Sequence, residues 1–79
     1  MEKLQKYNRI FEEIFGVEND ELNENFTMEE VGRWNSLAHI SLISSIEDEF
    51  EIMFDPEDIL AFNSYKQGKK ILEEYNVEL

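Results

Sequence analysis

The 79-residue chain contains no cysteine, one proline and three glycines, and it has few cationic side chains. The absence of cysteine excludes disulfides, thiolate metal ligands and a cysteine nucleophile, so any thiol chemistry must come from a bound group. A chain with so little proline and glycine has no recognisable linker, and we expect residues 1–79 to form a single domain. So small a domain leaves little room for a cleft that encloses a substrate, and we expect the protein not to be an enzyme.

Positive charge is the other scarce property. Seven Lys and Arg stand against nineteen Asp and Glu, which gives a formal net charge of −12. This charge repels nucleic acid and anionic membranes and favours partner proteins with basic surfaces. The apolar content of 42% is too high for a disordered chain, so the acids should coat a folded body. The chain has no apolar run of signal-peptide or membrane-spanning length, so we expect a cytoplasmic location. We also expect the protein to be a monomer.

Apolar residues recur at three- and four-residue intervals over most of the chain, which indicates helices. Residues 4–15 follow this spacing, and Gly16 stands where a left-handed residue would end the first helix. The spacing is lost in residues 17–34, where polar residues surround isolated apolar side chains. We expect a long loop there, pinned to the core, and loops of this length in compact domains tend to have a function.

The helical spacing resumes after this loop. Leu37, Ile40, Ile43 and Ile46 predict a second helix over about residues 36–50, with these positions in the core. The chain that follows, up to the next helix, is expected to form a buried turn.

Two more helices are predicted near the C-terminus. Asp55 and Pro56 supply a cap and a first-turn proline for a short third helix, and Asn63 or Ser64 can cap the last one. Gly68 inside the last helix costs up to about 1 kcal/mol relative to alanine, which suggests close packing against a neighbour. No segment is a clear candidate for strand pairing. We therefore predict an all-α fold, a small antiparallel four-helix bundle with one short helix and a long loop between the first two helices.

The triplet Asn35-Ser36-Leu37 falls at the predicted start of the second helix, directly after the long loop. Together with the blocks at residues 46–50, 54–59 and 64–65, it resembles the acyl carrier protein family, in which an Asp-Ser-Leu triplet begins the second helix of a four-helix bundle. The resemblance implies that Ser36 bears 4′-phosphopantetheine, transferred from coenzyme A by a phosphopantetheinyl transferase. Asn35 and Leu37 are then the motif neighbours, and acyl groups are carried as thioesters on the arm, with the core sheltering part of the chain.

The residues around Ser36 suit such a site. A helix N-terminus offers unpaired amides and a partial positive charge to a phosphate. If Asn35 caps the helix, the Ser36 hydroxyl stays available, whereas a serine that capped its own helix would compete with modification. The alternative interpretation is that Ser36 simply begins a helix.

The chain departs from the family at two points. Asn35 lacks the charge of the usual aspartate, and the first turns of the second helix carry no acids. A specialised pathway in lipid, polyketide, peptide or polysaccharide modification therefore fits better than housekeeping fatty acid biosynthesis. We interpret His39 as a partly exposed bystander, with a place near the phosphate as the alternative. Trp34 is expected to pack against the first turn, near His39.

Acidic residues gather from the end of the second helix into the third, and they form either a solvated surface or a docking surface for partner enzymes. This acidic band comprises Glu47, Asp48, Glu49, Glu51, Asp55, Glu57 and Asp58. Its spacing does not match a calcium-binding loop, and we predict no metal site. Two other functions remain open, an unmodified carrier-like adaptor that acts through this acidic surface and an acidic inhibitor of a basic enzyme.

Overall fold

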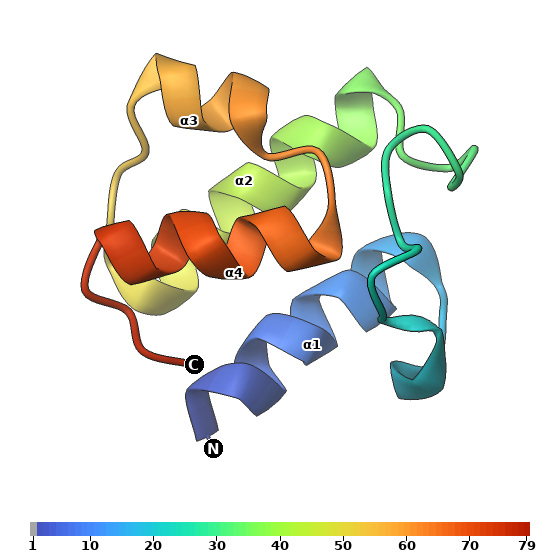
Figure 1. Cartoon of the computed structure of the whole chain (residues 1–79), viewed down its shortest axis with the longest axis horizontal. Coiled ribbons are helices and arrows are strands. Elements are labelled where there is room, and N and C mark those ends of the chain that lie inside the picture. The colour runs from blue at the N-terminus through green and yellow to red at the C-terminus, as the bar shows by residue number, and fades with distance from the viewer. Residues whose placement is uncertain (1) are drawn as a thin grey trace.

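A computed structural model describes residues 2–79 and shows helices joined by loops, without a strand in this range. Its α-helices are α1 (Glu2–Phe15), α2 (Ser36–Phe50), α3 (Pro56–Ala61) and α4 (Tyr65–Glu74), and a 3₁₀ turn η1 (Asn19–Glu21) lies in the first loop. α1 and α2 run in opposite directions, and the start of α1 lies near the C-terminal end of the chain (Figure 1). The predicted all-α bundle, with three longer helices and one short helix, is confirmed.

The residues at the helix ends explain where the helices stop and start. Gly16 has a φ of 65° and donates its N–H to the Glu12 carbonyl at 2.9 Å, which ends α1 as predicted. Of the two candidate caps for α4, Ser64 is the cap, because its Oγ accepts from Gln67 N at 2.9 Å. Asp55 is the N-cap residue of α3, as predicted, although within the described chain its side chain accepts no cap hydrogen bond. Its backbone carbonyl accepts from Asp58 N and Ile59 N instead.

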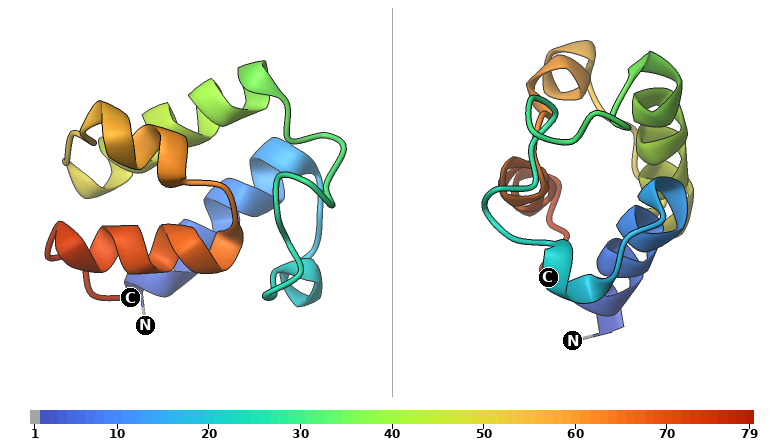
Figure 2. Two further views of the ribbon diagram at one scale, coloured as in Figure 1. Left: turned by 45° about the horizontal axis from the view of Figure 1, so that its top comes forward. Right: turned by 90° about the vertical axis from the view of Figure 1, so that its right-hand side faces the viewer.

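Aromatic rings fill the core. Phe11 lies at their centre, with ring centroids 5.0–6.4 Å from those of its six aromatic neighbours, namely Tyr7, Phe15, Phe26, Trp34, Phe62 and Tyr65. Phe26 and Trp34 come from the long loop, which closes one end of the bundle (Figure 2). These two buried side chains pin the loop to the core as the sequence predicted. Rings that pack edge-on add about 0.5–1.5 kcal/mol per pair to their burial.

Part of the predicted core of α2 is wrong. Leu37 and Ile40 are 78% and 63% exposed, whereas Leu42, Ile43 and Ile46 are buried. The reason is geometric, because each residue of a helix advances by roughly 100° and nine residues place Leu37 on the opposite side from Ile46. A strict three-residue spacing thus rotates out of the core within a few turns.

The turn after α2 is less buried than predicted. Phe54 is 4% exposed, but Met53 is 82% exposed, and Phe50 and Ile52 are half-buried. Glu51 ends α2 in a left-handed conformation with a φ of 54°, so the chain reverses before it reaches the core. Leu60 of α3 also points outwards and is 82% exposed. Among residues 2–79, no helix combines the length and apolar character that crossing a bilayer requires.

Candidate functional site

Ser36 is the first residue of α2 and is exposed to solvent. The helix is capped by its neighbour, since Asn35 Oδ1 accepts from Ala38 N at 2.9 Å and the Asn35 carbonyl accepts from His39 N at 2.8 Å. Within residues 2–79 the Ser36 hydroxyl makes no hydrogen bond. The predicted cap by Asn35 is therefore confirmed, and the serine hydroxyl is not consumed by it.

The backbone around Ser36 can hold an anionic group. The amides of Ser36 and Leu37 have no acceptor in the part of the chain that the structure describes, because the cap takes the next two. α2 carries no acid in its first turn, so no carboxylate there opposes a phosphate. The positive end of the helix dipole adds to this preference for an anion. A phosphodiester on Ser36 Oγ fits this environment.

His39, one turn after Ser36, joins three parts of the fold. Trp34 Nε1 donates to His39 Nδ1 at 3.0 Å, and His39 Nε2 lies 2.9 Å from the Ile59 carbonyl of α3. Because an indole N–H can only donate, His39 Nδ1 must accept from Trp34. His39 Nε2 therefore carries the ring proton and donates it in a hydrogen bond to the Ile59 carbonyl. His39 is partly exposed, as predicted, but the two hydrogen bonds give it a structural contact that the sequence did not indicate, and the predicted packing of Trp34 near His39 is confirmed.

The carboxylates of the acidic band differ in their contacts: three of them are hydrogen-bonded or ion-paired, and the others are exposed. Glu47 Oε2 accepts from Phe54 N at 2.9 Å, Glu49 pairs with Lys6 at 3.5 Å, and Asp58 accepts from the Tyr75 hydroxyl. That last hydrogen bond is the main reason why the pKa of Tyr75 is raised. The remaining members, Asp48, Glu51, Asp55 and Glu57, are exposed.

The members of the acidic band on α2, Glu47, Asp48 and Glu49, lie away from Ser36 along the helix. Glu47 follows Ser36 by about 16 Å along the helix axis, at a rise of ~1.5 Å per residue. The side chains that flank Ser36 on the surface are instead the exposed Leu37 and Ile40. Among residues 2–79, no three His, Asp or Glu side chains are grouped so that they could hold a metal ion.

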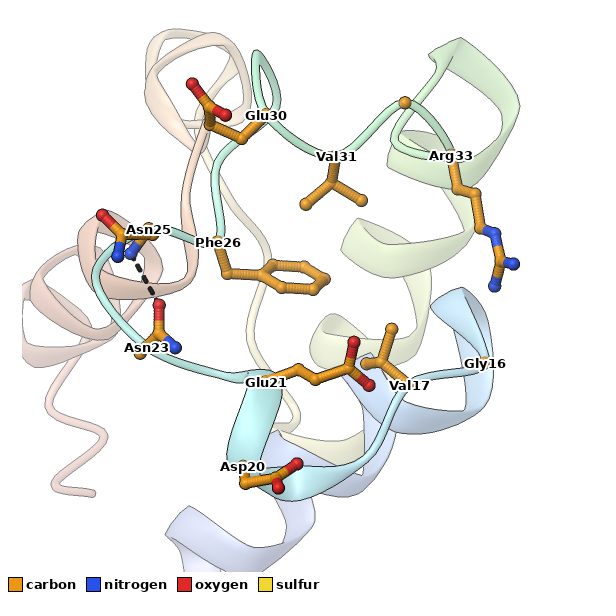
Figure 3. A pocket seen from close by; sticks show the side chains of 11 residues that line it. Gly16, Val17, Asp20, Glu21, Asn23, Asn25, Phe26, Glu30, Val31 and Arg33 are labelled. Carbon is orange, nitrogen blue, oxygen red and sulfur yellow. Dashed lines mark hydrogen bonds between the residues drawn. The ribbon is translucent and has the colours of Figure 1, made fainter.

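A hollow of about 640 Å³ lies in the long loop, and its lining extends to Arg33, three residues before Ser36 (Figure 3). Phe26, Val17 and Val31 point into it, and acidic and amide side chains surround them. Arg33 lines its edge and donates Nη1 to the Phe15 carbonyl at 2.8 Å, which places a cation at the C-terminus of α1. The sequence does not predict this contact, and the arginine just before the second helix is the one local signal for it.

A small helical bundle with an exposed serine at the start of its second helix is able to carry a group covalently attached to that serine's hydroxyl. The family model for the phosphopantetheine attachment site matches residues 8–67, well over half of the chain. The chain therefore belongs to the acyl carrier protein family, and its prosthetic group is covalently attached 4′-phosphopantetheine. No curated protein matches the chain.

Proposed function

We propose that the protein holds acyl intermediates as thioesters on a phosphopantetheine arm attached to Ser36 and presents them to partner enzymes, without catalysis of its own. The observation that supports this assignment best is the exposed Ser36 hydroxyl beside an asparagine cap. The arm supplies a terminal thiol, which this cysteine-free chain lacks.

The chain contributes the nucleophile and an anion-binding helix end to its own modification. Ser36 Oγ attacks the pantetheine-linked phosphorus of coenzyme A, a new P–O bond forms, and the bond to the adenosine bisphosphate leaving group breaks. Both ring nitrogens of His39 are already hydrogen-bonded, so this histidine does not serve as the base. The transferase must supply the base that removes the Ser36 proton.

Partner enzymes that reach Ser36 must contact the surface beside it. Leu37 and Ile40 offer an apolar contact there, and the exposed members of the acidic band, Asp48, Glu51, Asp55 and Glu57, offer negative charge. We propose that acyl-loading and acyl-transferring enzymes dock through basic surfaces that reach this band. Because the first turn of α2 lacks acids, we assign the protein to a specialised pathway of lipid, polyketide, peptide or polysaccharide modification.

The deciding experiment is the intact mass of the chain after incubation with coenzyme A, magnesium and a broad-specificity phosphopantetheinyl transferase. We expect the native chain to gain one phosphopantetheine and Ser36→Ala to gain none. Ser41→Ala is the matched control, since Ser41 is also an exposed serine of α2. A native chain that stays unmodified with every such transferase would favour the adaptor that acts through its acidic surface.

A further inference from the structure

We propose that the cargo on the Ser36 arm is a short acyl group that stays in solvent, because the bundle has no room to shelter a long chain. This inference rests on the proposed function and replaces the expectation that the core shelters part of the acyl group. Three features of the structure support it: a closed seam between α2 and α3, a filled interior behind that seam, and the position of the surface hollows.

The seam between α2 and α3 is closed next to Ser36. His39 crosses it through the bond from Nε2 to the Ile59 carbonyl at 2.9 Å. Trp34 holds the same ring from the loop side through its bond to Nδ1 at 3.0 Å, and the Phe62 ring lies 6.5 Å from the imidazole. A chain attached at Ser36 would have to break the His39–Ile59 hydrogen bond to pass between the helices here.

The space behind this seam is occupied. Trp34, Phe62 and Phe11 are at most 3% exposed, and their ring centroids lie 5.8–6.5 Å from one another. Interiors packed in this way have few voids larger than a water molecule, so an acyl chain would have to displace a ring rather than fill a gap.

The surface hollows do not offer a substitute. Five hollows of 180–640 Å³ on the surface are lined by other residues, and Ser36, Leu37 and His39 line none of these five. Phe26, Val17 and Val31 point into the hollow in the long loop, but Asp20, Glu21 and Glu30 border it and would place carboxylates against an apolar chain (Figure 3). Leu37 and Ile40 lie on the convex outer surface of α2. An acyl chain that packed on them would still have one side in water.

The length of the acyl group then determines which cargo suits this carrier. Each methylene left in water instead of buried costs about 0.8 kcal/mol, so the penalty for an unsheltered chain grows steadily with its length. A short or polar acyl group, such as an aminoacyl group, avoids that penalty. The unsheltered thioester is also open to attack, which suits rapid transfer to a partner.

The test loads the native chain with acetyl-, butyryl-, octanoyl- and dodecanoyl-phosphopantetheine from the corresponding coenzyme A thioesters. Intact mass first confirms loading, so a failure there counts against the proposed function and not against this inference. The readouts are the rate of thioester cleavage by hydroxylamine, relative to the same acyl group on free pantetheine, and the melting temperature. We expect relative rates that agree within twofold for all four chains, and no rise in melting temperature with length. A several-fold protection of the octanoyl or dodecanoyl thioester would overturn the inference.

A variant that opens the seam tests the residues held responsible. His39→Ala combined with Phe62→Leu removes the crossing imidazole and part of the ring behind it, and we expect at least threefold protection of the octanoyl thioester but not of the acetyl thioester. Ser41→Ala is the control and should behave as the native chain. An opened variant that melts cooperatively and still gives no protection would overturn the role of these two residues. If the double variant does not fold, His39→Ala alone provides the same comparison.

Discussion

Two adjacent residues divide two roles at the start of α2. Asn35 Oδ1 satisfies the Ala38 amide, while Ser36 lies one residue further on with its hydroxyl directed to solvent. A serine cap would be bound by the helix that it begins, because capping uses the same oxygen that modification needs. The separation of the two roles is what makes Ser36 chemically available.

Substitutions of Asn35 separate the cap from the charge. Asn35→Ala removes the cap and should lower the free energy of unfolding by about 1 kcal/mol. Asn35→Asp keeps the accepting oxygen and adds a negative charge at the positive helix end, which should stabilise the fold by about 0.3–1 kcal/mol. We also expect Asn35→Asp to be modified faster, because the charge attracts a basic residue on the transferase. Urea unfolding and the time course of the mass increase measure the two effects, and equal modification rates for the native chain and Asn35→Asp would show that the missing charge does not matter.

Gly68 is required by packing rather than by backbone conformation. A Cβ at this position would overlap the Phe62 ring and the Tyr7 hydroxyl. We expect Gly68→Ala to destabilise the protein by about 1–3 kcal/mol, although alanine is the better helix former. Gly32→Ala is the matched control, because a Cβ at Gly32 meets no atom within 4 Å, and it should change stability little. A neutral Gly68→Ala in thermal unfolding would contradict the close packing of α4 on α1.

Tyr7 couples the stability of the fold to alkaline pH. Its hydroxyl is fully buried and donates to the Tyr65 carbonyl at 2.7 Å, and burial, with a smaller effect of Tyr65, raises the pKa of Tyr7 well above 10. The fold thus favours neutral Tyr7, so this stabilisation is complete below pH ~10 and is lost as the pH rises towards the pKa of the folded state.

Tyr7→Phe should therefore lose about 1 kcal/mol at neutral pH, where the hydrogen bond is missing. Above pH ~10 its stability should fall less steeply than that of the native chain, by roughly 1 kcal/mol per pH unit. Urea unfolding between pH 8 and pH 11 measures both slopes. The same slope for the two proteins would mean that Tyr7 does not control the alkaline transition, leaving Tyr65 and Tyr75, whose pKa values are also raised.

At the scale of elements, local signals in the sequence predicted the helices and their ends. Gly16, Asn35 and Ser64 act through neighbours within a few residues, so their roles can be inferred from the order of residues alone. The exposed side of α2 was mispredicted, because a three-residue spacing alone does not show which side of the helix faces the core. The bond between His39 and Ile59 joins residues twenty positions apart, and no local pattern indicates it.

The short helix α3 is held by side chains from other elements. None of Pro56–Ala61 is buried. Glu47 accepts from Phe54 N, the Tyr75 hydroxyl accepts from Asp55 N at 2.8 Å, and His39 contacts the Ile59 carbonyl. Segments with few buried apolar contacts open at lower free energy than the core does, so α3 should be the first helix to detach.

Amide hydrogen exchange tests this attachment. In the native chain we expect the amides of α3 to exchange faster than those of α1. His39→Ala should speed exchange in α3 by a further fivefold or more, since one hydrogen bond contributes about 1 kcal/mol. Ser41→Ala is the control, and its exposed side chain lies in the same helix. An increase of the same size in α1 and α3 would show that His39 stabilises the whole fold and does not act on α3 in particular.

At the scale of the whole molecule, the two signs of charge are separated along the chain. Residues 34–65, which include α2 and α3, contain no Lys or Arg, and the cations lie on α1, on α4 and at Arg33. The body that carries the net charge of −12 measures only 28 × 27 × 19 Å. The Debye length is ~30 Å at 0.01 M salt and ~3 Å at 1 M, so at low salt the acids repel one another across the entire molecule.

Salt should therefore stabilise this protein. We expect the melting temperature to rise by about 5 °C between 0.01 M and 0.5 M NaCl, which corresponds to roughly 1 kcal/mol for a domain of this size. The opposing effect is small, because the Lys6–Glu49 pair at 3.5 Å is exposed and such pairs contribute about 0–1 kcal/mol. Lys6→Gln should lower stability slightly at low salt and leave the direction of the salt effect unchanged. A melting temperature that falls with salt would show that attractive pairs outweigh the repulsion among the acids of α2 and α3.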